Sequence, residues 1–141
     1  MMSGIRGKNT KPELLVRKML HAAGFRYRLH DKALPGKPDM VFPKYRAVIL
    51  VHGCFWHGHG CHLFRLPSTR TEFWKRKIDG NVERDREAVR KLRDTGWRVA
   101  TVWECALKGK RRLQPDIVEK ALVNWLHGES PQLEVTGSCS D

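Results

Sequence analysis

Apolar residues recur along the first part of the chain with the period of a helix and then with that of a strand. Between Thr10 and Gly24 apolar residues recur at helical spacing, at Leu14, Leu15, Met19, Leu20 and Ala23. Thr10-Lys-Pro-Glu13 is a capping-box pattern at the start of this segment, and Gly24 is a natural stop. From Phe25 to His30 apolar and polar residues alternate, which predicts a half-buried strand.

Two more strands are predicted on either side of a proline turn. Asp39–Phe42 and Arg46–His52 have the composition of strands, and Pro43–Tyr45 joins them. The second strand is apolar at consecutive positions, so we expect both its faces to be covered and its place to be central in the sheet.

The second half of the chain predicts two helices around one strand. A helix is expected over residues 71–94, with Gly80 as a candidate bend, and Trp97–Trp103 is expected to be a strand. Gln114-Pro-Asp opens a last helix before Gly128, with an apolar stripe formed by Ile117, Leu122, Trp125 and Leu126. The order α-β-β-β-α-β-α predicts an α/β fold, with a mixed central sheet flanked by helices on both faces.

The net positive charge of the chain indicates the kind of partner that it binds. The 141 residues hold 27 Lys and Arg against 15 Asp and Glu, a formal net charge of +12 with a pI of about 10.0. Such a balance favours a polyanion such as nucleic acid, although a merely soluble basic protein has the same composition. The last fourteen residues hold acids but no Lys or Arg. We therefore expect one domain over residues 1–127 and a flexible polar, acidic tail over residues 128–141.

The loop after the central strand is rich in metal-ligating residues. Residues 51–61 read VHGCFWHGHGC, and Cys105 follows the fourth strand. A structural zinc ion needs four sulfur or nitrogen ligands, which Cys54, one or two loop histidines, Cys61 and Cys105 can supply. The alternative is that Cys54 and Cys105 are ordinary buried thiols. Cys139 lies in the tail and is interpreted as a free thiol.

Several residues near this loop are candidates for catalysis. The loop histidines exceed what zinc needs, and a spare histidine can act as an acid or base near neutral pH. Asp39 is either a metal ligand or the cap of a turn, and Glu13 is either a helix cap or a catalytic group. His52 ends the strand next to that of Asp39, so both strand ends could face one pocket. His21, His30 and His127 are interpreted as surface or helix-end residues.

Aromatic and basic residues suggest how DNA would be held. Phe55 and Trp56 either fold into the core or stand out as wedges that insert between base steps. Trp74 lies beside Arg70, Lys75 and Arg76, a mixture that suits stacking and phosphate contact. Lys77 and Asn81 share one helical face, where Asn81 could read a base edge and Lys77 a base or a phosphate.

The motifs IRGKNTKPE, LPGKPD, VHGCFWHGHGC, TEFWKRKI, NVERD and GWRVATVWECAL together resemble the very short patch repair (Vsr) endonuclease family. The resemblance runs from about residue 4 to residue 127. It implies a restriction-endonuclease-like core and an enzyme that nicks duplex DNA 5′ to the mispaired thymine of a T:G mismatch, which starts repair of deaminated 5-methylcytosine. It further implies catalytic Mg²⁺, structural Zn²⁺, a monomer acting in the cytoplasm at the nucleoid, and mismatch-repair proteins as further candidate partners.

The resemblance also assigns roles to residues. The catalytic positions are Asp39, His52, His57 and Glu13, and the Mg²⁺ contacts are Asp39 and the main-chain carbonyl of Val51. The zinc ligands are Cys54, His59, Cys61 and Cys105. The DNA contacts are Phe55, Trp56, Trp74, Lys77 and Asn81, and Asp85 matches an acidic residue near the site with no assigned role. Family members carry a longer N-terminal arm, and some have Thr where this chain has Val51.

Two other functions compete with mismatch nicking. One is a nuclease of the same fold that acts on a different DNA substrate. The other is a zinc-stabilised DNA-binding module that does not cut, against which Asp39 and the two histidines His52 and His57 argue, because a binding module does not need them.

Overall fold

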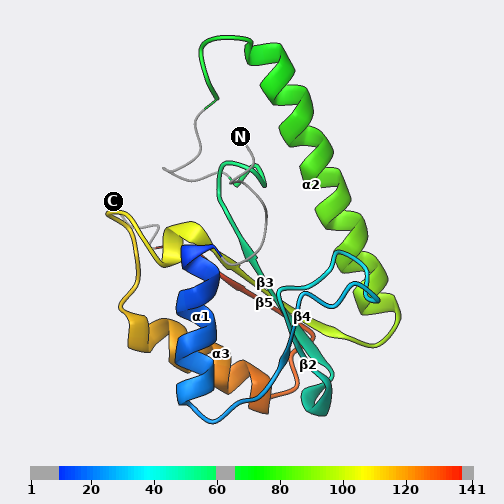
Figure 1. The fold of residues 1–141 in the computed structure, drawn as a ribbon, viewed down its shortest axis with the longest axis vertical. Helices are drawn as coiled ribbons and strands as arrows, with labels where there is room; N and C mark the ends of the chain where they lie inside the picture. The colour runs from blue at the N-terminus through cyan, green and yellow to red at the C-terminus, as the bar shows by residue number, and fades with distance from the viewer. Residues whose placement is uncertain (1–9, 60–65, 138–141) are drawn as a thin grey trace.

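In the computed structural model, which describes residues 10–59 and 66–137, five strands form one mixed sheet (Figure 1). The strands are β1 (Arg28–Leu29), β2 (Met40–Phe42), β3 (Ala47–His52), β4 (Arg98–Trp103) and β5 (Gln132–Val135). They lie in chain order across the sheet, with antiparallel pairing from β1 to β3 and parallel pairing from β3 to β5. The strand β3 is therefore central, as its apolar sequence predicts.

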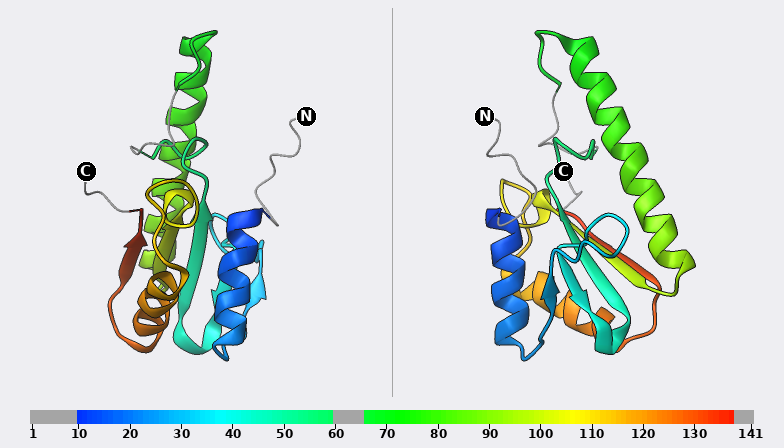
Figure 2. Two further views of the ribbon diagram at one scale, coloured as in Figure 1. Left: turned by 90° about the vertical axis from the view of Figure 1, so that its left-hand side faces the viewer. Right: turned by 45° about the vertical axis from the view of Figure 1, so that its right-hand side comes forward.

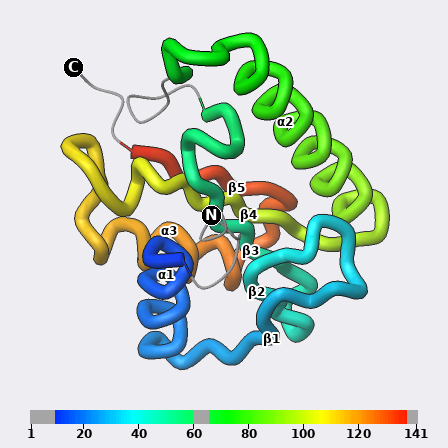
Figure 3. Tube along the Cα trace, turned by 45° about the horizontal axis from the view of Figure 1, so that its top comes forward, coloured from blue at the N-terminus to red at the C-terminus, as the bar shows by residue number. Residues whose placement is uncertain are grey.

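Helices cover both faces of this sheet. α1 (Lys11–Ala22) and α3 (Pro115–His127) lie on one face and α2 (Thr71–Asp94) on the other (Figures 2 and 3). The first part of α2 projects well beyond the sheet, and only its later turns pack on it (Figure 1). Short 3-10 helices, η2 (Pro43–Tyr45) and η3 (Glu104–Ala106), follow β2 and β4. The predicted α/β class with a mixed sheet is confirmed.

The alternation of side chains along β3 divides the core into two parts. Ile49 packs with residues of α1 and α3, whereas Val48 and Leu50 pack with Leu92 of α2. Because successive side chains of a strand point to opposite faces, one short apolar strand supplies both parts. Its carboxyl end is held from both faces, and the candidate site lies at that end.

The helices are where the sequence predicts them, but some residues predicted to lie on their buried apolar faces are exposed. The Thr10 hydroxyl accepts a hydrogen bond from the Glu13 amide at 3.3 Å, which confirms the predicted cap of α1. Leu14 and Leu15 are 42% and 47% exposed, and Ile117 of α3 is 50% exposed. The buried face of α1 is formed instead by Glu13, Val16 and Leu20.

The edges of the sheet differ from the prediction. β1 has only two residues, because Phe25 turns inward and joins the core while the chain pairs with β2 only at Arg28 and Leu29. The expectation of a flexible tail from residue 128 is wrong for Gln132–Val135. These residues pair in parallel with β4, and Val135 is buried in the core.

Within the described residues, no helix is both long enough and apolar enough to cross a membrane. The one long helix, α2, is rich in charged residues. α2 continues through Gly80 as a single helix, so the candidate bend produces no break.

Candidate functional site

The carboxyl end of β3 lies between two clusters of ionisable side chains. One cluster consists of Glu13, His30 and Asp39, and the other of His52, His57 and Asp85. In each cluster the possible ligand atoms lie within 4.8 Å of one another. Two consecutive residues of β3 connect the clusters. The Val51 amide contacts Asp39 of the first cluster, and His52 is a member of the second. No hydrogen bond or ion pair joins Asp39 to His52 or His57 among the described residues.

The first cluster is built on α1, β1 and the start of β2. The Asp39 Oδ2 atom accepts a hydrogen bond of 2.7 Å from the Val51 amide, which fixes the carboxylate at the edge of β3. The His30 Nε2 atom lies 2.5 Å from Glu13 Oε2 and 4.0 Å from Asp39 Oδ1. Arg17, one turn after Glu13, pairs with the same Glu13 oxygen at 3.1 Å. The cluster therefore places two carboxylates and an imidazole around one point.

Burial makes it costly for both carboxylates of this cluster to be ionised. Glu13 is 1% exposed and Asp39 8% exposed. The pKa of Asp39 is raised to about 7, chiefly by burial and also by the nearby charge of Glu13, against the opposing effects of the Val51 amide and Arg17. A bound cation would favour the ionised form of Asp39, so the donor set fits an oxygen-preferring divalent ion.

The Val51 carbonyl is expected to point to the same side of β3 as its amide. In an antiparallel pair, the amide and carbonyl of one residue point toward the same neighbouring strand. The Val51 amide points to Asp39, so its carbonyl is expected on that side as well. Only the main chain is involved, so the side chain at position 51 does not decide whether the contact can form.

The second cluster joins the end of β3 to the middle of α2. The rings of His52 and His57 are stacked, with centroids 3.8 Å apart and an angle of 3° between their planes. The His57 Nδ1 atom lies 2.5 Å from Asp85 Oδ2. An ionised carboxylate can only accept, so Nδ1 carries the hydrogen and Nε2 is left to exchange a proton with a substrate.

His52 is held neutral. It is 9% exposed, and its Nδ1 atom has no hydrogen-bond partner among the residues that the structure describes. The pKa of His52 is lowered to about 3, chiefly by burial and also by His57, while Asp85 partly opposes the shift. At neutral pH, His52 therefore lacks the charge of an imidazolium.

A groove of about 690 Å³ opens between α2 and the strands β4 and β5. His52, His57 and Asp85 are in its lining, together with arginines of α2. The second cluster is thus open to solvent through this groove, whereas the first is more deeply buried.

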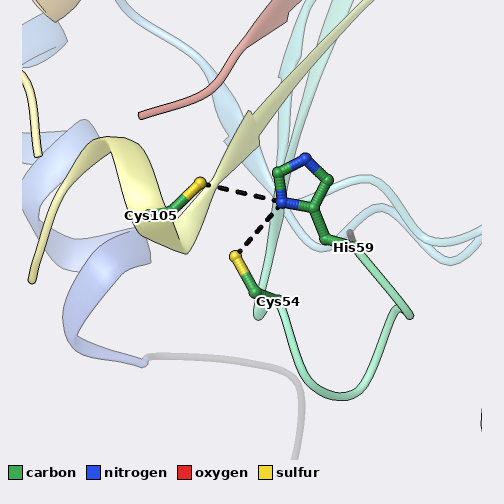
Figure 4. A group of neighbouring side chains, drawn as sticks. All are labelled: Cys54, His59 and Cys105. Carbon is green, nitrogen blue, oxygen red and sulfur yellow. Dashed lines mark hydrogen bonds between the residues drawn. The ribbon is translucent and has the colours of Figure 1, made fainter. Parts of the chain in front are cut away.

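A third cluster brings sulfur and nitrogen donors together. The His59 Nδ1 atom lies 3.5 Å from the Cys54 sulfur and 3.7 Å from the Cys105 sulfur, and both thiols point at this nitrogen (Figure 4). Cys54 is fully buried and Cys105 nearly so. Burial lowers the pKa of His59, which favours the neutral ligand form, although Glu134 opposes the shift. Two sulfurs and one imidazole are the donors that zinc prefers.

The surroundings of this third cluster hold its donors in place. The His59 ring stacks on Trp103 with centroids 4.1 Å apart, and Trp103 donates a 2.9 Å hydrogen bond to Glu134 of β5. The Gly137 amide donates to the Cys105 sulfur at 3.3 Å. The unpredicted strand β5 thus supports the cluster from the side opposite the loop.

The loop between β3 and α2 is docked on the helix. Asn81 donates a 2.8 Å hydrogen bond to the Trp56 carbonyl. Gly58 has φ of 63°, and a side chain there would come within 2.8 Å of Val82. The aromatic rings of Phe55, Trp56 and Trp74 then gather within 5.8 Å of one another by centroid, and each is only partly buried. These rings do not fold into the core, which leaves them accessible to a partner.

The structure brings most of the predicted site residues together. Asp39 and Glu13 meet in one cluster, His52 and His57 in another, and the three described zinc candidates in the third. Cys61 lies outside the described residues. Lys77 is exposed on α2, and Asn81, predicted to read a base, also tethers the loop.

The sequence analysis missed one member of the first cluster, because His30, interpreted as a surface or helix-end residue, lies against Glu13. Asp85 was matched to an acidic residue near the site through the motif NVERD but left without a role, and the structure pairs it with His57. No local pattern marks His30, because its contact with Glu13 joins distant segments. The side chain of Glu13 also extends beyond the cap of α1 and pairs with His30 and Arg17.

Known proteins that resemble this chain are named as a DNA mismatch endonuclease or as nicking enzymes. The family profile described as DNA mismatch endonuclease Vsr matches residues 1–63. The DNA mismatch endonuclease Vsr of Escherichia coli strain K12 is 46% identical over 138 residues, which cover 96% of this chain and 88% of that protein. The type II nicking enzyme V.XorIIP of Xanthomonas oryzae pv. oryzae is 53% identical over 107 residues, or 76% of this chain and 79% of that protein. The type II nicking enzyme V.NmeAIP of Neisseria meningitidis serogroup A is 50% identical over 110 residues, or 78% and 79%.

Proposed function

The chain belongs to the DNA mismatch endonuclease Vsr family, and from that premise we propose that it nicks one strand of duplex DNA 5′ to the mispaired thymine of a T:G mismatch. Its substrate is DNA and its activity is that of a mismatch-repair endonuclease. The observation that carries the finer proposal is the position of two ionisable clusters at one strand end, beside three partly exposed aromatic rings.

The proposed core is that of the restriction-endonuclease-like nucleases, with the acidic cluster as its metal site. Asp39 and the Val51 carbonyl would hold Mg²⁺, and the buried Asp39 carboxylate, with its second oxygen fixed by the Val51 amide, supports this. When bound, Mg²⁺ polarises the phosphate and eases deprotonation of the attacking water. Glu13 contributes negative charge to the same site, and its burial against Arg17 keeps it in one position.

The histidine cluster would move the proton. Hydrolysis of a phosphodiester needs a group that takes a proton from water or gives one to the leaving oxygen. His57 is proposed for this transfer, because Asp85 fixes its ring and leaves Nε2 available. His52 packs flat on His57 and orients it, and its low pKa keeps a second positive charge away from the ring.

Mismatch selection is proposed for the aromatic rings. Phe55, Trp56 and Trp74 would wedge into the base stack, which costs less at a mispaired step than at a matched one. All three are partly exposed, Phe55 and Trp56 on the loop docked on α2 and Trp74 in the first turn of α2, which supports this role. Lys77 and Asn81, on the same helix, would contact the neighbouring backbone or bases. Zn²⁺ held by Cys54, His59, Cys61 and Cys105 would fix the loop that presents the wedge.

The test is a nicking assay on a labelled T:G duplex with Mg²⁺. We expect Asp39→Asn to lower the single-turnover rate by about 100-fold or more, because one carboxylate of the metal site is removed. Asn has nearly the same shape and can keep the Val51 contact, so folding should be preserved, as circular dichroism would check. His21→Gln, on the exposed side of α1, is the matched control and should cut normally. Nicking by Asp39→Asn at the normal rate would reject the metal-site assignment.

A further inference from the structure

The cluster of Glu13, His30 and Asp39 contains a donor that the proposed Mg²⁺ site does not require. The His30 nitrogen lies 2.5 Å from Glu13 Oε2 and 4.0 Å from Asp39 Oδ1. One donor atom from each residue lies within 4.8 Å of the other two. The three side chains come from α1, the end of β1 and the start of β2, and they converge although they are far apart in the sequence.

The backbone fixes His30 in this place. Its amide donates a 3.2 Å hydrogen bond to the Asp39 carbonyl, directly after the pair formed by Leu29 and Met40. Its φ is 48°, a left-handed conformation that is uncommon for residues other than glycine, although histidine adopts it more often than most. Such strain is retained where the surrounding structure requires it, and it is frequent at functional sites. With this backbone conformation, the His30 imidazole points toward the carboxylates of Glu13 and Asp39.

The charge balance of the cluster favours binding of a cation. Two carboxylates are almost fully buried, with Arg17 paired to Glu13 as the neighbouring permanent positive charge. Asp39 Oδ2 is bound to the Val51 amide, whereas Oδ1 faces His30. Buried carboxylates close together are costly unless paired or bound to metal. A divalent ion between them would remove this cost.

The chemistry of the donors indicates which ion. Mg²⁺ prefers oxygen ligands and dehydrates reluctantly. Mn²⁺ shares the preference for oxygen, but as the first member of the divalent first-row series it accepts an imidazole nitrogen beside carboxylates more readily than Mg²⁺ does. We propose that Glu13, His30 and Asp39 form a mixed nitrogen–oxygen site for one divalent cation, in which the His30 imidazole makes Mn²⁺ bind more tightly than Mg²⁺. The inference shares Asp39 with the proposed function and rests on it to that extent.

A simpler role for His30 is to orient Glu13 by a hydrogen bond without touching the ion. The two roles differ in what a glutamine at position 30 would do. The Gln amide can donate a hydrogen bond to Glu13, but it cannot replace the imidazole nitrogen as a ligand. His30→Gln therefore removes ligation while keeping a donor beside the carboxylate.

The test is Mn²⁺ binding to the full chain, with its zinc retained and without DNA, followed by electron paramagnetic resonance of the free ion. Mg²⁺ affinity is obtained by competition in the same samples. We expect the natural chain to prefer Mn²⁺, and His30→Gln to weaken Mn²⁺ binding by about tenfold or more while Mg²⁺ binding changes much less. In pulsed spectra of bound Mn²⁺, the coupling to a ligand nitrogen should be present in the natural chain and lost in His30→Gln.

His21→Gln is the matched control, since His21 is exposed on the same helix as Glu13, and it should bind Mn²⁺ as the natural chain does. Equal Mn²⁺ affinity and an unchanged nitrogen coupling in His30→Gln would overturn the proposal and leave His30 as a residue that only orients Glu13. Retained circular dichroism in each variant excludes misfolding as the cause. Mn²⁺ binding as expected, with no nicking of T:G duplexes, would reject the proposed function and keep this inference.

Discussion

Two consecutive residues at the end of β3 serve different parts of the site. The Val51 amide holds Asp39 on the side of β2, and the His52 ring stacks on His57 beneath α2. Val51 acts through its main chain toward the neighbouring strand, whereas His52 acts through its side chain on the face covered by α2, so one strand end can position a candidate metal ligand and a candidate proton carrier at once. A shift of register by one residue would exchange the two environments.

The buried state of His52 predicts a pH dependence of stability. Its pKa is lowered from 6.5 to about 3, so the unfolded chain binds a proton more readily than the folded one. The contribution of neutral His52 to stability is complete above pH 6.5 and is lost as pH falls toward 3. We expect a loss of up to about 3 kcal/mol from this group between pH 7 and pH 4. His52→Asn should show a flatter decline in urea unfolding at these pH values.

Comparing the natural chain with His52→Asn isolates the effect of His52, because the other titrating groups are the same in both proteins. The same loss of stability in the natural chain and in His52→Asn would mean that His52 is not held neutral by the fold.

Residue roles were predictable only where the sequence itself marks them. Asp39, His52 and His57 stand in motifs, so family resemblance located them without a structure. His30 has no such mark: its meeting with Glu13 depends on how α1 packs beside β1, which local periodicity does not report. Asp85 stands in the motif NVERD, so the resemblance located it near the site, but its pairing with His57 depends on the docking of the loop on α2.

At the scale of elements, the contact between the loop and α2 controls the geometry of the candidate wedge. Gly58 approaches the helix so closely that a Cβ atom would lie 2.8 Å from Val82 and 3.0 Å from Ile78. Asn81 adds a hydrogen bond to the Trp56 carbonyl. The aromatic rings and His57 are therefore positioned by the same docking surface.

Replacement of Gly58 by alanine tests this contact. We expect Gly58→Ala to destabilise the protein by about 2–3 kcal/mol, since the clash adds to the cost of the positive φ. Gly24→Ala is the control: its φ is 99°, and nothing lies within 4 Å of a Cβ there. It should cost only the backbone strain, about 1 kcal/mol. Equal losses in thermal unfolding of the two variants would show that the loop does not pack as described.

The sulfur cluster gives a second prediction at this scale. We expect Cys105→Ser to lower the zinc content of the purified protein and its melting temperature, because one of the thiolate ligands is removed. Cys139→Ser is the matched control, since the proposed ligand set does not include Cys139, and it should keep its zinc. The measurement is elemental analysis combined with thermal unfolding. Full zinc content in Cys105→Ser would exclude Cys105 as a ligand.

Elements with strong apolar periodicity were predicted closely, and weak ones were not. α2 and β3 have the expected bounds within a residue. β5 was missed because Gln132–Val135 buries only Val135, so its alternation is faint and its neighbourhood polar. On α1 the spacing of Leu14 and Leu15 suggested the wrong face, since the buried stripe contains the charged Glu13. A carboxylate inside an apolar stripe follows from the site, which sequence periodicity does not describe.

The whole molecule combines a basic body with a small acidic centre. The net charge of +12 favours approach to DNA, while Asp39 and Glu13 are buried at the end of the central strand. The first part of α2 projects beyond the sheet (Figure 1), and it carries Trp74, whose ring lies near that of Trp56. Substrate binding and catalysis would thus occupy one end of the molecule.

The central claim is tested most directly by strand-resolved cleavage of matched and mismatched duplexes. Each strand of a T:G duplex is labelled and incubated with the protein and Mg²⁺, beside T:A and C:G duplexes of the same sequence. We predict one nick, 5′ to the mispaired thymine, in the T:G duplex and at least about 100-fold slower cutting of both controls, from the difference in unstacking cost. Equal cutting of all three duplexes would contradict mismatch selection, and intact T:G duplex under conditions of tight binding would contradict the proposed cleavage itself.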